Sequence, residues 1–154
     1  MPPVAETGTK SVPPPPEPAS RRAGIYIRAL VDRQDMARSF EDRELFDPLA
    51  AADLEWEPVS GYPEGVSRRI LYEADDRRSA LVRYDPGTDT GDEPLTHGFY
   101  EECWILQGEI VDKRLDESFE AGAYTTRTPG MVHGPYRVPP GSDPCLMFVH
   151  EFEE

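Results

Sequence analysis

The sequence predicts an all-β domain, built as a sandwich or barrel of short strands. From Leu54 onward, stretches with strand-like alternation recur roughly every ten residues, and turns rich in Gly, Pro and Asp separate them. No long stretch has the spacing of an amphipathic helix, so the crossover helices of a doubly wound sheet have no place in this chain.

Three parts are expected along the chain. The proline run Val12–Pro18 cannot donate backbone hydrogen bonds and has little to bury, which predicts a disordered tail over residues 1–24. Residues 25–53 should form a first strand at Ile25–Val31 and then an arm with one or two short helical turns, packed on the barrel or on a second subunit. Residues 54–154 are predicted to be the barrel itself.

The alternation and the turns place the later strands. They are expected at residues 54–59, 66–73, 79–84, 103–112, 122–128 and 145–150. The hydrophobicity of Cys103–Asp112 is nearly continuous up to Leu106, which predicts a strand packed on both faces. The hairpin 112–120 is charged and is expected to be exposed.

Composition limits the partners. A formal net charge of -14 argues against nucleic acid and against an anionic membrane surface, and leaves a small-molecule substrate as the expected partner. The two cysteines have neither a disulfide-framework spacing nor a zinc-ribbon spacing. The chain has no apolar run long enough to span a membrane, and its start lacks the apolar core of a secretion signal, so a cytoplasmic location is expected.

Two of the three histidines lie in segments that suit a reactive site. His97 stands with two carboxylates, Glu101 and Glu102, just ahead of an apolar run that a glycine closes. His133 follows the turn Pro129-Gly130. Imidazole and carboxylate together suit a transition-metal site or acid–base chemistry.

Strand parity separates the two acids. His97 and Glu101 share parity, so an extended chain places them on one face. Cys103, Ile105 and Gln107 continue the same inward row. Glu102 points the other way unless a bulge intervenes, so Glu101 is the preferred ligand and Glu102 is expected behind it or at the surface.

These segments resemble the paired motifs of the cupin superfamily. The first motif reads G-x5-H-x-H-x3/4-E-x6-G, and Glu101, Gly108 and His97 fit it. When His97 is the second histidine, Leu95 stands in the place of the first. In the other register His97 is the first histidine and Phe99 replaces the second. Either way, one of the four usual metal ligands is missing.

The second motif reads G-x5-P-x-G-x2-H-x3-N, and Gly122, Gly130 and His133 fit it. Thr128 stands in the proline place and Arg137 in the asparagine place. The closer likeness is to ChrR-like and acetylacetone-dioxygenase-like cupins, over residues 54–152.

The resemblance implies a single cupin jelly-roll barrel with a mononuclear metal held by His97, Glu101 and His133. Two histidines and one carboxylate suit Fe(II), Mn(II), Ni(II) or Zn(II) and leave positions open for substrate or dioxygen. Fe(II) is the expected metal. His150, on the last strand, can supply the missing ligand or is an edge-strand histidine. The homodimer that we expect, paired through Ile25–Val31, also rests on the resemblance.

Other side chains near the motifs are candidates for the pocket. Tyr100, Trp104, Tyr124, Met131 and Phe148 can line an apolar site or belong to the core. Arg83, Arg127 and Arg137 can hold a substrate carboxylate or enolate, or can be solvated at strand edges. The predicted catalytic group consists of Glu101, Glu102, Tyr100 and Arg127.

The first functional hypothesis is a cupin dioxygenase that acts on a small dicarbonyl- or enol-type substrate, by analogy with the enzymes it resembles. The second is a metal-dependent cupin isomerase, cyclase or lyase that uses the metal as a Lewis acid or uses His and Glu as acid and base. A non-catalytic ligand-sensing cupin is the third. The alternative to every metal-dependent hypothesis is a cupin barrel that has lost its metal and keeps His97 and His133 as ordinary hydrogen-bonded side chains.

Overall fold

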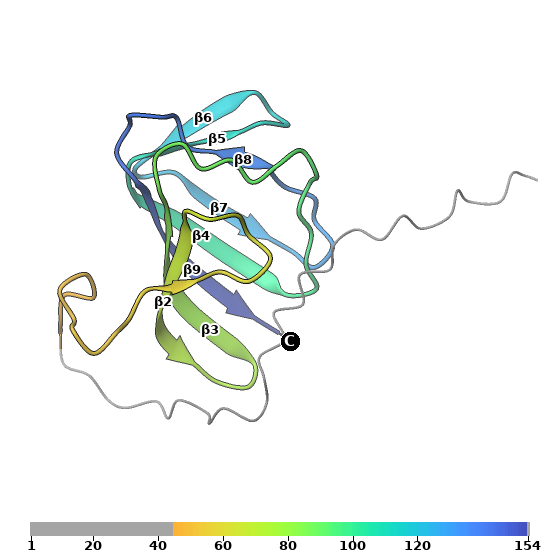
Figure 1. The fold of residues 1–154 in the computed structure, drawn as a ribbon. Coiled ribbons are helices and arrows are strands. Elements are labelled where there is room, and N and C mark those ends of the chain that lie inside the picture. Colours follow the sequence, from red (N-terminus) through yellow and green to blue (C-terminus); the bar gives the residue numbers. More distant parts are fainter. Residues whose placement is uncertain (1–44, 154) are drawn as a thin grey trace, which may run out of the picture.

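The computed structural model describes residues 45–153, which form two antiparallel β-sheets (Figure 1). The six-stranded sheet has the order β1-β2-β3-β9-β4-β7 and the three-stranded sheet the order β6-β5-β8. The larger sheet is made of β1 (Glu57–Pro58), β2 (Val66–Glu73), β3 (Arg77–Tyr84), β4 (Tyr100–Gln107), β7 (Tyr124–Arg127) and β9 (Cys145–Phe152). The smaller sheet is made of β5 (Glu109–Asp112), β6 (Glu117–Glu120) and β8 (Tyr136–Arg137).

The predicted all-β class is confirmed, and the part of the chain from residue 45 to 153 contains no α-helix. Within that part, no helix could cross a membrane. The predicted tail and the predicted strand at Ile25–Val31 lie outside the described residues.

One hydrophobic core joins the two sheets. Ile105 and Met147 from the larger sheet pack in the same buried cluster as Ile110 and Tyr136 from the smaller one. Because side chains alternate along a strand, each sheet contributes one face to this layer and turns the other outward. The site described below is built on the inward face.

A break at Gly108 separates β4 from β5, so the prediction of one strand over Cys103–Asp112 is wrong. Gly108 has a φ of 74°, in the left-handed region that favours glycine. A Cβ atom at this position would lie 2.3 Å from the carbonyl oxygen of Pro144. The sharp turn and the close approach let the chain pass from the larger sheet to the smaller one.

Strand β4 is buried on one face only, which corrects the expectation of a strand packed on both. Cys103 and Ile105 are each 5% exposed, whereas Trp104 is 52% and Leu106 48% exposed. A register shift between Ile105 and Gln107 then takes Gln107 out of the inward row, and its side chain is exposed. The outward apolar side chains of β4 therefore lie on a partly exposed face of the sheet and are not covered by a second packed layer.

The described part of the arm packs against the outer face of β2. The guanidinium of Arg69 donates to the carbonyl oxygens of Pro48 and Leu49, and its Cζ lies 4.9 Å from the centre of the Trp56 ring. Arg69 is only 8% exposed as a result. The strand predicted for residues 54–59 shortens to β1.

Gly108 and Gly87 provide a matched pair for testing the turn. Gly108→Ala should lower the free energy of unfolding by about 3 kcal/mol or more, because left-handed strain of roughly 1–2 kcal/mol adds to the displacement of Pro144. Gly87 has a similar φ of 82° but open space around a Cβ. Gly87→Ala should therefore lower the free energy of unfolding only by the left-handed strain of roughly 1–2 kcal/mol. Urea unfolding of both variants measures the difference, and equal losses would show that the close approach to Pro144 is unimportant.

Candidate metal centre

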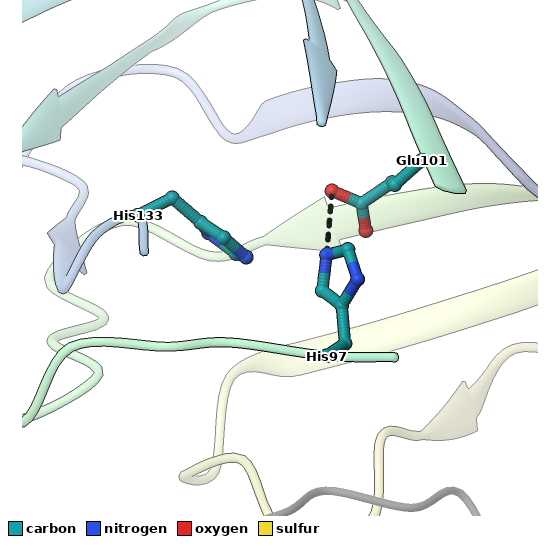
Figure 2. Close-up of side chains that lie close together, drawn as sticks. All are labelled: His97, Glu101 and His133. Carbon is teal, nitrogen blue, oxygen red and sulfur yellow. Dashed lines mark ion pairs between the residues drawn. The ribbon is translucent and has the colours of Figure 1, made fainter. Parts of the chain in front are cut away.

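The structure brings His97, Glu101 and His133 together (Figure 2). Each offers one ligand atom, and these atoms lie within 4.8 Å of one another. Glu101 comes from β4, His97 from the segment just before it, and His133 from the segment between β7 and β8. These are the three ligands predicted from the motifs.

Backbone hydrogen bonds hold the two histidine-bearing segments side by side. Leu95 and His133 exchange a pair of bonds, with N–O distances of 2.8 and 3.0 Å. The amide of Gly130 donates to the carbonyl of His97 at 2.8 Å. The Pro129-Gly130 turn thus fixes the position of His133 relative to His97.

The environment of His97 leaves one ring nitrogen free for a ligand. Its Nδ1 lies 2.9 Å from the carbonyl oxygen of Phe99, and the Phe99 ring stacks on the imidazole at 4.1 Å. A carbonyl oxygen only accepts, so in the neutral form of the ring Nδ1 carries the proton and Nε2 has a lone pair for a metal. This Nε2 is buried without a hydrogen-bond partner and lies 3.7 Å from Glu101 Oε1.

His133 is oriented by Tyr136. Its Nδ1 lies 3.1 Å from the Tyr136 hydroxyl, and its own Nε2 is also buried without a partner. When the hydroxyl oxygen accepts from Nδ1–H, Nε2 is left with a lone pair directed at the cluster. Hydrogen bonds of this kind set which nitrogen can bind a metal.

Arg127 holds the carboxylate from behind. Its guanidinium donates to Glu101 Oε1, to Cys103 Sγ at 3.1 Å and to the Tyr136 hydroxyl at 3.0 Å. No hydrogen bond among residues 45–153 engages the other carboxylate oxygen, Oε2. Glu101 can therefore keep its ion pair and still present an oxygen to a ligand.

The electrostatics favour a neutral His133 and an ionised Glu101. Burial, reinforced by the charge of Arg127, lowers the pKa of His133 to about 4. Burial alone would raise the pKa of Glu101, but His97 and Arg127 outweigh it and bring that pKa down to about 2. Near neutral pH the cluster thus offers an imidazole and a carboxylate in the forms that bind metals.

These residues fit a divalent transition metal. Buried polar nitrogens without partners are uncommon in folded proteins, and here two of them converge on one carboxylate. Two neutral imidazoles and one carboxylate form the donor set found with Fe(II), Mn(II), Ni(II) and Zn(II). A metal would satisfy both nitrogens at once.

The cluster lies in a cavity of about 450 Å³ between the sheets. Its lining is largely apolar and includes Val66, Ile105 and Met147, together with both residues that replace a motif histidine, Leu95 and Phe99. The described residues therefore place no fourth ligand of the usual kind in the cluster. The volume falls within the range of small-molecule sites.

Three residues of the predicted site lie away from the cluster, on the outer face. Glu102 accepts a hydrogen bond from the Tyr124 hydroxyl at 2.7 Å, and Tyr100 stacks on Phe152 at 5.2 Å. The Nδ1 of His150 lies 2.9 Å from Ser79 Oγ, so the expectation that His150 completes the ligand set finds no support in its position. The cause is parity, because Tyr100 and Glu102 alternate with the inward Glu101 and Glu102 is registered opposite His150.

The other side chains predicted near the site divide between cavity and surface. Trp104 and Tyr124 meet edge to edge on the outer face, both more than half exposed, and Tyr124 also belongs to the cavity lining. Met131 is 42% exposed and contributes to the cavity lining. Of the three arginines proposed to hold a substrate, Arg127 alone lies at the cluster, whereas Arg83 pairs with Asp85 and Arg137 is exposed.

A row of charged side chains runs through the cluster, and three of its members, Glu151, Arg78 and Glu73, were not predicted from the sequence. Cross-strand register places Arg127, Glu101, Glu151, Arg78 and Glu73 in line across five strands of the larger sheet. Arg78 pairs with Glu151 and lies 3.6 Å from Glu73. Tyr62 and Tyr84, which also line the cavity, were missed as well. No local pattern marks these residues, because their alignment depends on the pairing of distant segments.

Fold and cluster together define a cupin. Structural comparison shows similarity to the polyketide cyclase RemF from Streptomyces resistomycificus, at 21% identity and a TM-score of 0.59, over 73% of this chain and 81% of that one. An acetylacetone dioxygenase from Acinetobacter johnsonii is similar at 13% identity and a TM-score of 0.54, over 77% of this chain and 80% of that one. At such identities the likeness shows the fold.

Family membership is more specific. The ChrR cupin-like domain family matches residues 48–153, well over half of the chain, so the protein belongs to that family. No curated protein matches it. A sugar phosphate isomerase of the cupin superfamily from Silicibacter pomeroyi is another structural relative, at 18% identity and a TM-score of 0.51, over 66% of this chain and 72% of that one. The predicted resemblance to ChrR-like cupins is confirmed, and the acetylacetone dioxygenase shares the fold.

The lowered pKa of His133 predicts a pH dependence of stability in chelator-treated protein. Between its ordinary pKa of 6.5 and the folded-state value of about 4, the unfolded chain binds a proton that the folded chain does not. The free energy of unfolding should therefore fall as pH drops through this window, by at most about 3 kcal/mol. Urea unfolding at several pH values should show a shallower fall for His133→Gln. Identical slopes for variant and wild type would contradict the assignment.

Proposed function

We propose that this protein is a metal-dependent cupin enzyme, and that it is a mononuclear non-haem iron dioxygenase acting on a small organic substrate of dicarbonyl or enol type. The observation that carries the proposal is the pair of partnerless Nε2 atoms facing the Glu101 carboxylate. Two histidines and one carboxylate with open positions are typical of non-haem Fe(II) oxygenases.

His97, Glu101 and His133 would hold the metal. Once bound, such an ion supplies a Lewis acid for an enolate oxygen and, as iron, a route for electrons to dioxygen. The surrounding residues hold these ligands in place. The Phe99 carbonyl fixes the ring of His97, and Tyr136 fixes that of His133. A preset orientation of this kind lowers the cost of binding.

The cavity supports a substrate with more apolar than polar surface. Its walls leave the side chains of His97 and Glu101 only 8% and 12% exposed, and both the inward faces of the sheets and the loops between strands contribute to the lining. Excluding water strengthens electrostatic interactions inside the site and protects reactive species from hydrolysis. The names of two structural relatives, a polyketide cyclase and an acetylacetone dioxygenase, are compatible with oxygen-bearing carbon substrates.

A metal-dependent cyclase or isomerase is the second candidate, and Glu151 favours it. This carboxylate lines the same cavity and is registered directly opposite Glu101. Burial raises the pKa of Glu151, although Arg78 acts in the opposite direction. A carboxylate with a raised pKa accepts a proton more readily than an exposed one, which suits acid–base chemistry without a redox step.

Metal content provides the first test. Elemental analysis of the purified protein should find one transition metal per chain, and iron is expected. His97→Ala and His133→Ala should each lose most of it, because two remaining ligands bind far more weakly. His150→Ala is the matched control and should keep the wild-type content, since His150 bonds to Ser79 on the outer face. A metal-free wild type, or loss of metal in the His150 variant, would contradict the assigned ligands.

Oxygen uptake separates the two candidate enzymes. With iron-loaded protein and a β-diketone such as acetylacetone, consumption of diketone should be matched by consumption of dioxygen, because the oxygenase reaction incorporates it. Under an anaerobic atmosphere turnover should stop. Turnover that continues without dioxygen, and that requires Glu151, would favour the cyclase or isomerase instead.

A further inference from the structure

Two tyrosines of the cavity have hydroxyl groups that the rest of the structure does not use. Tyr62 lies between β1 and β2 and Tyr84 ends β3, and their rings meet edge to edge at 6.4 Å. Both line the cavity that holds the ligand cluster. Among residues 45–153, neither hydroxyl takes part in a hydrogen bond, although a buried tyrosine hydroxyl usually finds a partner.

Both hydroxyls remain protonated near neutral pH. Burial raises the pKa of Tyr62, and the negative charge of Glu101 raises it further. Burial also raises the pKa of Tyr84, with Tyr62 and Tyr136 acting in the same direction. The cavity thus presents two O–H donors in addition to the ligand cluster.

The arginines of the cavity are already neutralised. Arg127 pairs with Glu101, Arg78 with Glu151, and Arg68 with Glu57. Arg114, the other arginine of the lining, is exposed on the turn after β5. Among the described residues, a carboxylate or phosphate group that entered the interior without binding the metal would therefore meet no unpaired arginine apart from the exposed Arg114, and burying an unpaired anion is costly.

We propose that Tyr62 and Tyr84 form a subsite that hydrogen-bonds a second oxygen of a neutral phenolic or enolic substrate larger than a five-carbon diketone, whose first oxygen faces His97, Glu101 and His133. The proposal gives a substrate class to the site and rests on the proposed function. The size of the cavity supports it, because about 450 Å³ corresponds to the volume of roughly fifteen water molecules, far more than a five-carbon diketone requires.

A pair of probes that differ at one substituent, which is neutral in one and anionic in the other, tests the class of substrate. The anthraquinones chrysophanol and rhein have the same dihydroxylated ring system, but chrysophanol carries a methyl group where rhein carries a carboxylate. Equilibrium dialysis against the full-length protein should show that chrysophanol binds at least about 10-fold more tightly than rhein. Equal or tighter binding of rhein, or the absence of saturable chrysophanol binding, would overturn the proposal.

Substitutions that remove only a hydroxyl test the subsite. Tyr62→Phe and Tyr84→Phe should each weaken chrysophanol binding by roughly 2- to 10-fold, the usual range for one hydrogen bond. Tyr72→Phe is the matched control, because Tyr72 lies opposite Ser79 on the outer face and should bind the probe like wild type. Wild-type affinity in both cavity variants would overturn the subsite.

The outcome separates this proposal from the metal assignment. All three tyrosine variants should keep the wild-type metal content, since none of them contributes a ligand. If the wild-type protein contains no metal, the proposed function is wrong. The tyrosine subsite is decided separately, by the dialysis results for the two probes and the tyrosine variants. If a tyrosine variant fails to fold, the comparison of chrysophanol with rhein on wild-type protein still decides the substrate class.

Discussion

The ion pair between Arg127 and Glu101 is the interaction on which the rest of the site depends. The two residues are register partners on β7 and β4, and both side chains are nearly excluded from solvent. Through its other donors, Arg127 also reaches the Tyr136 hydroxyl, which in turn orients His133. Removing one partner would leave a buried charge uncompensated, an expensive state in a protein interior. The pair therefore fixes both the charge of the carboxylate and the geometry around it.

Other charged side chains on the inward face of the larger sheet are also paired with a side chain of opposite charge. Glu101 and Glu151 face each other in register, a repulsive arrangement, and each has its own arginine on the far side. The sheet thereby tolerates a line of charges beside an apolar core, and the cavity keeps a nearly neutral interior. A site of this kind favours neutral substrates and binds them through shape and hydroxyl donors.

Much of this arrangement was predictable from the sequence. Most of what could not be predicted depends on contacts between segments that are far apart in the chain. Shared parity placed His97 and Glu101 on one face, and the turn before His133 indicated the third ligand, because both are local patterns. The contact of Arg127 with Glu101 depends on strand register between distant segments, and the place of Tyr62 in the cavity lining depends on the packing of a distant loop, neither of which a local pattern encodes. The two-residue strand β8 was missed because it is too short to alternate. The break at Gly108 was missed because its cause is the approach of Pro144, thirty-six positions along the chain.

The backbone ties between Leu95 and His133 have a consequence for how this site can change over evolution. They hold the two loops together through amide and carbonyl groups, which every non-proline residue possesses. A mutation that exchanges a ligand side chain on either loop leaves this scaffold intact. Ligands can thus be lost, moved or regained one at a time without loss of the fold. The leucine at position 95, where the motif has a histidine, is therefore compatible with an intact backbone scaffold, because Leu95 still pairs with His133 through main-chain groups.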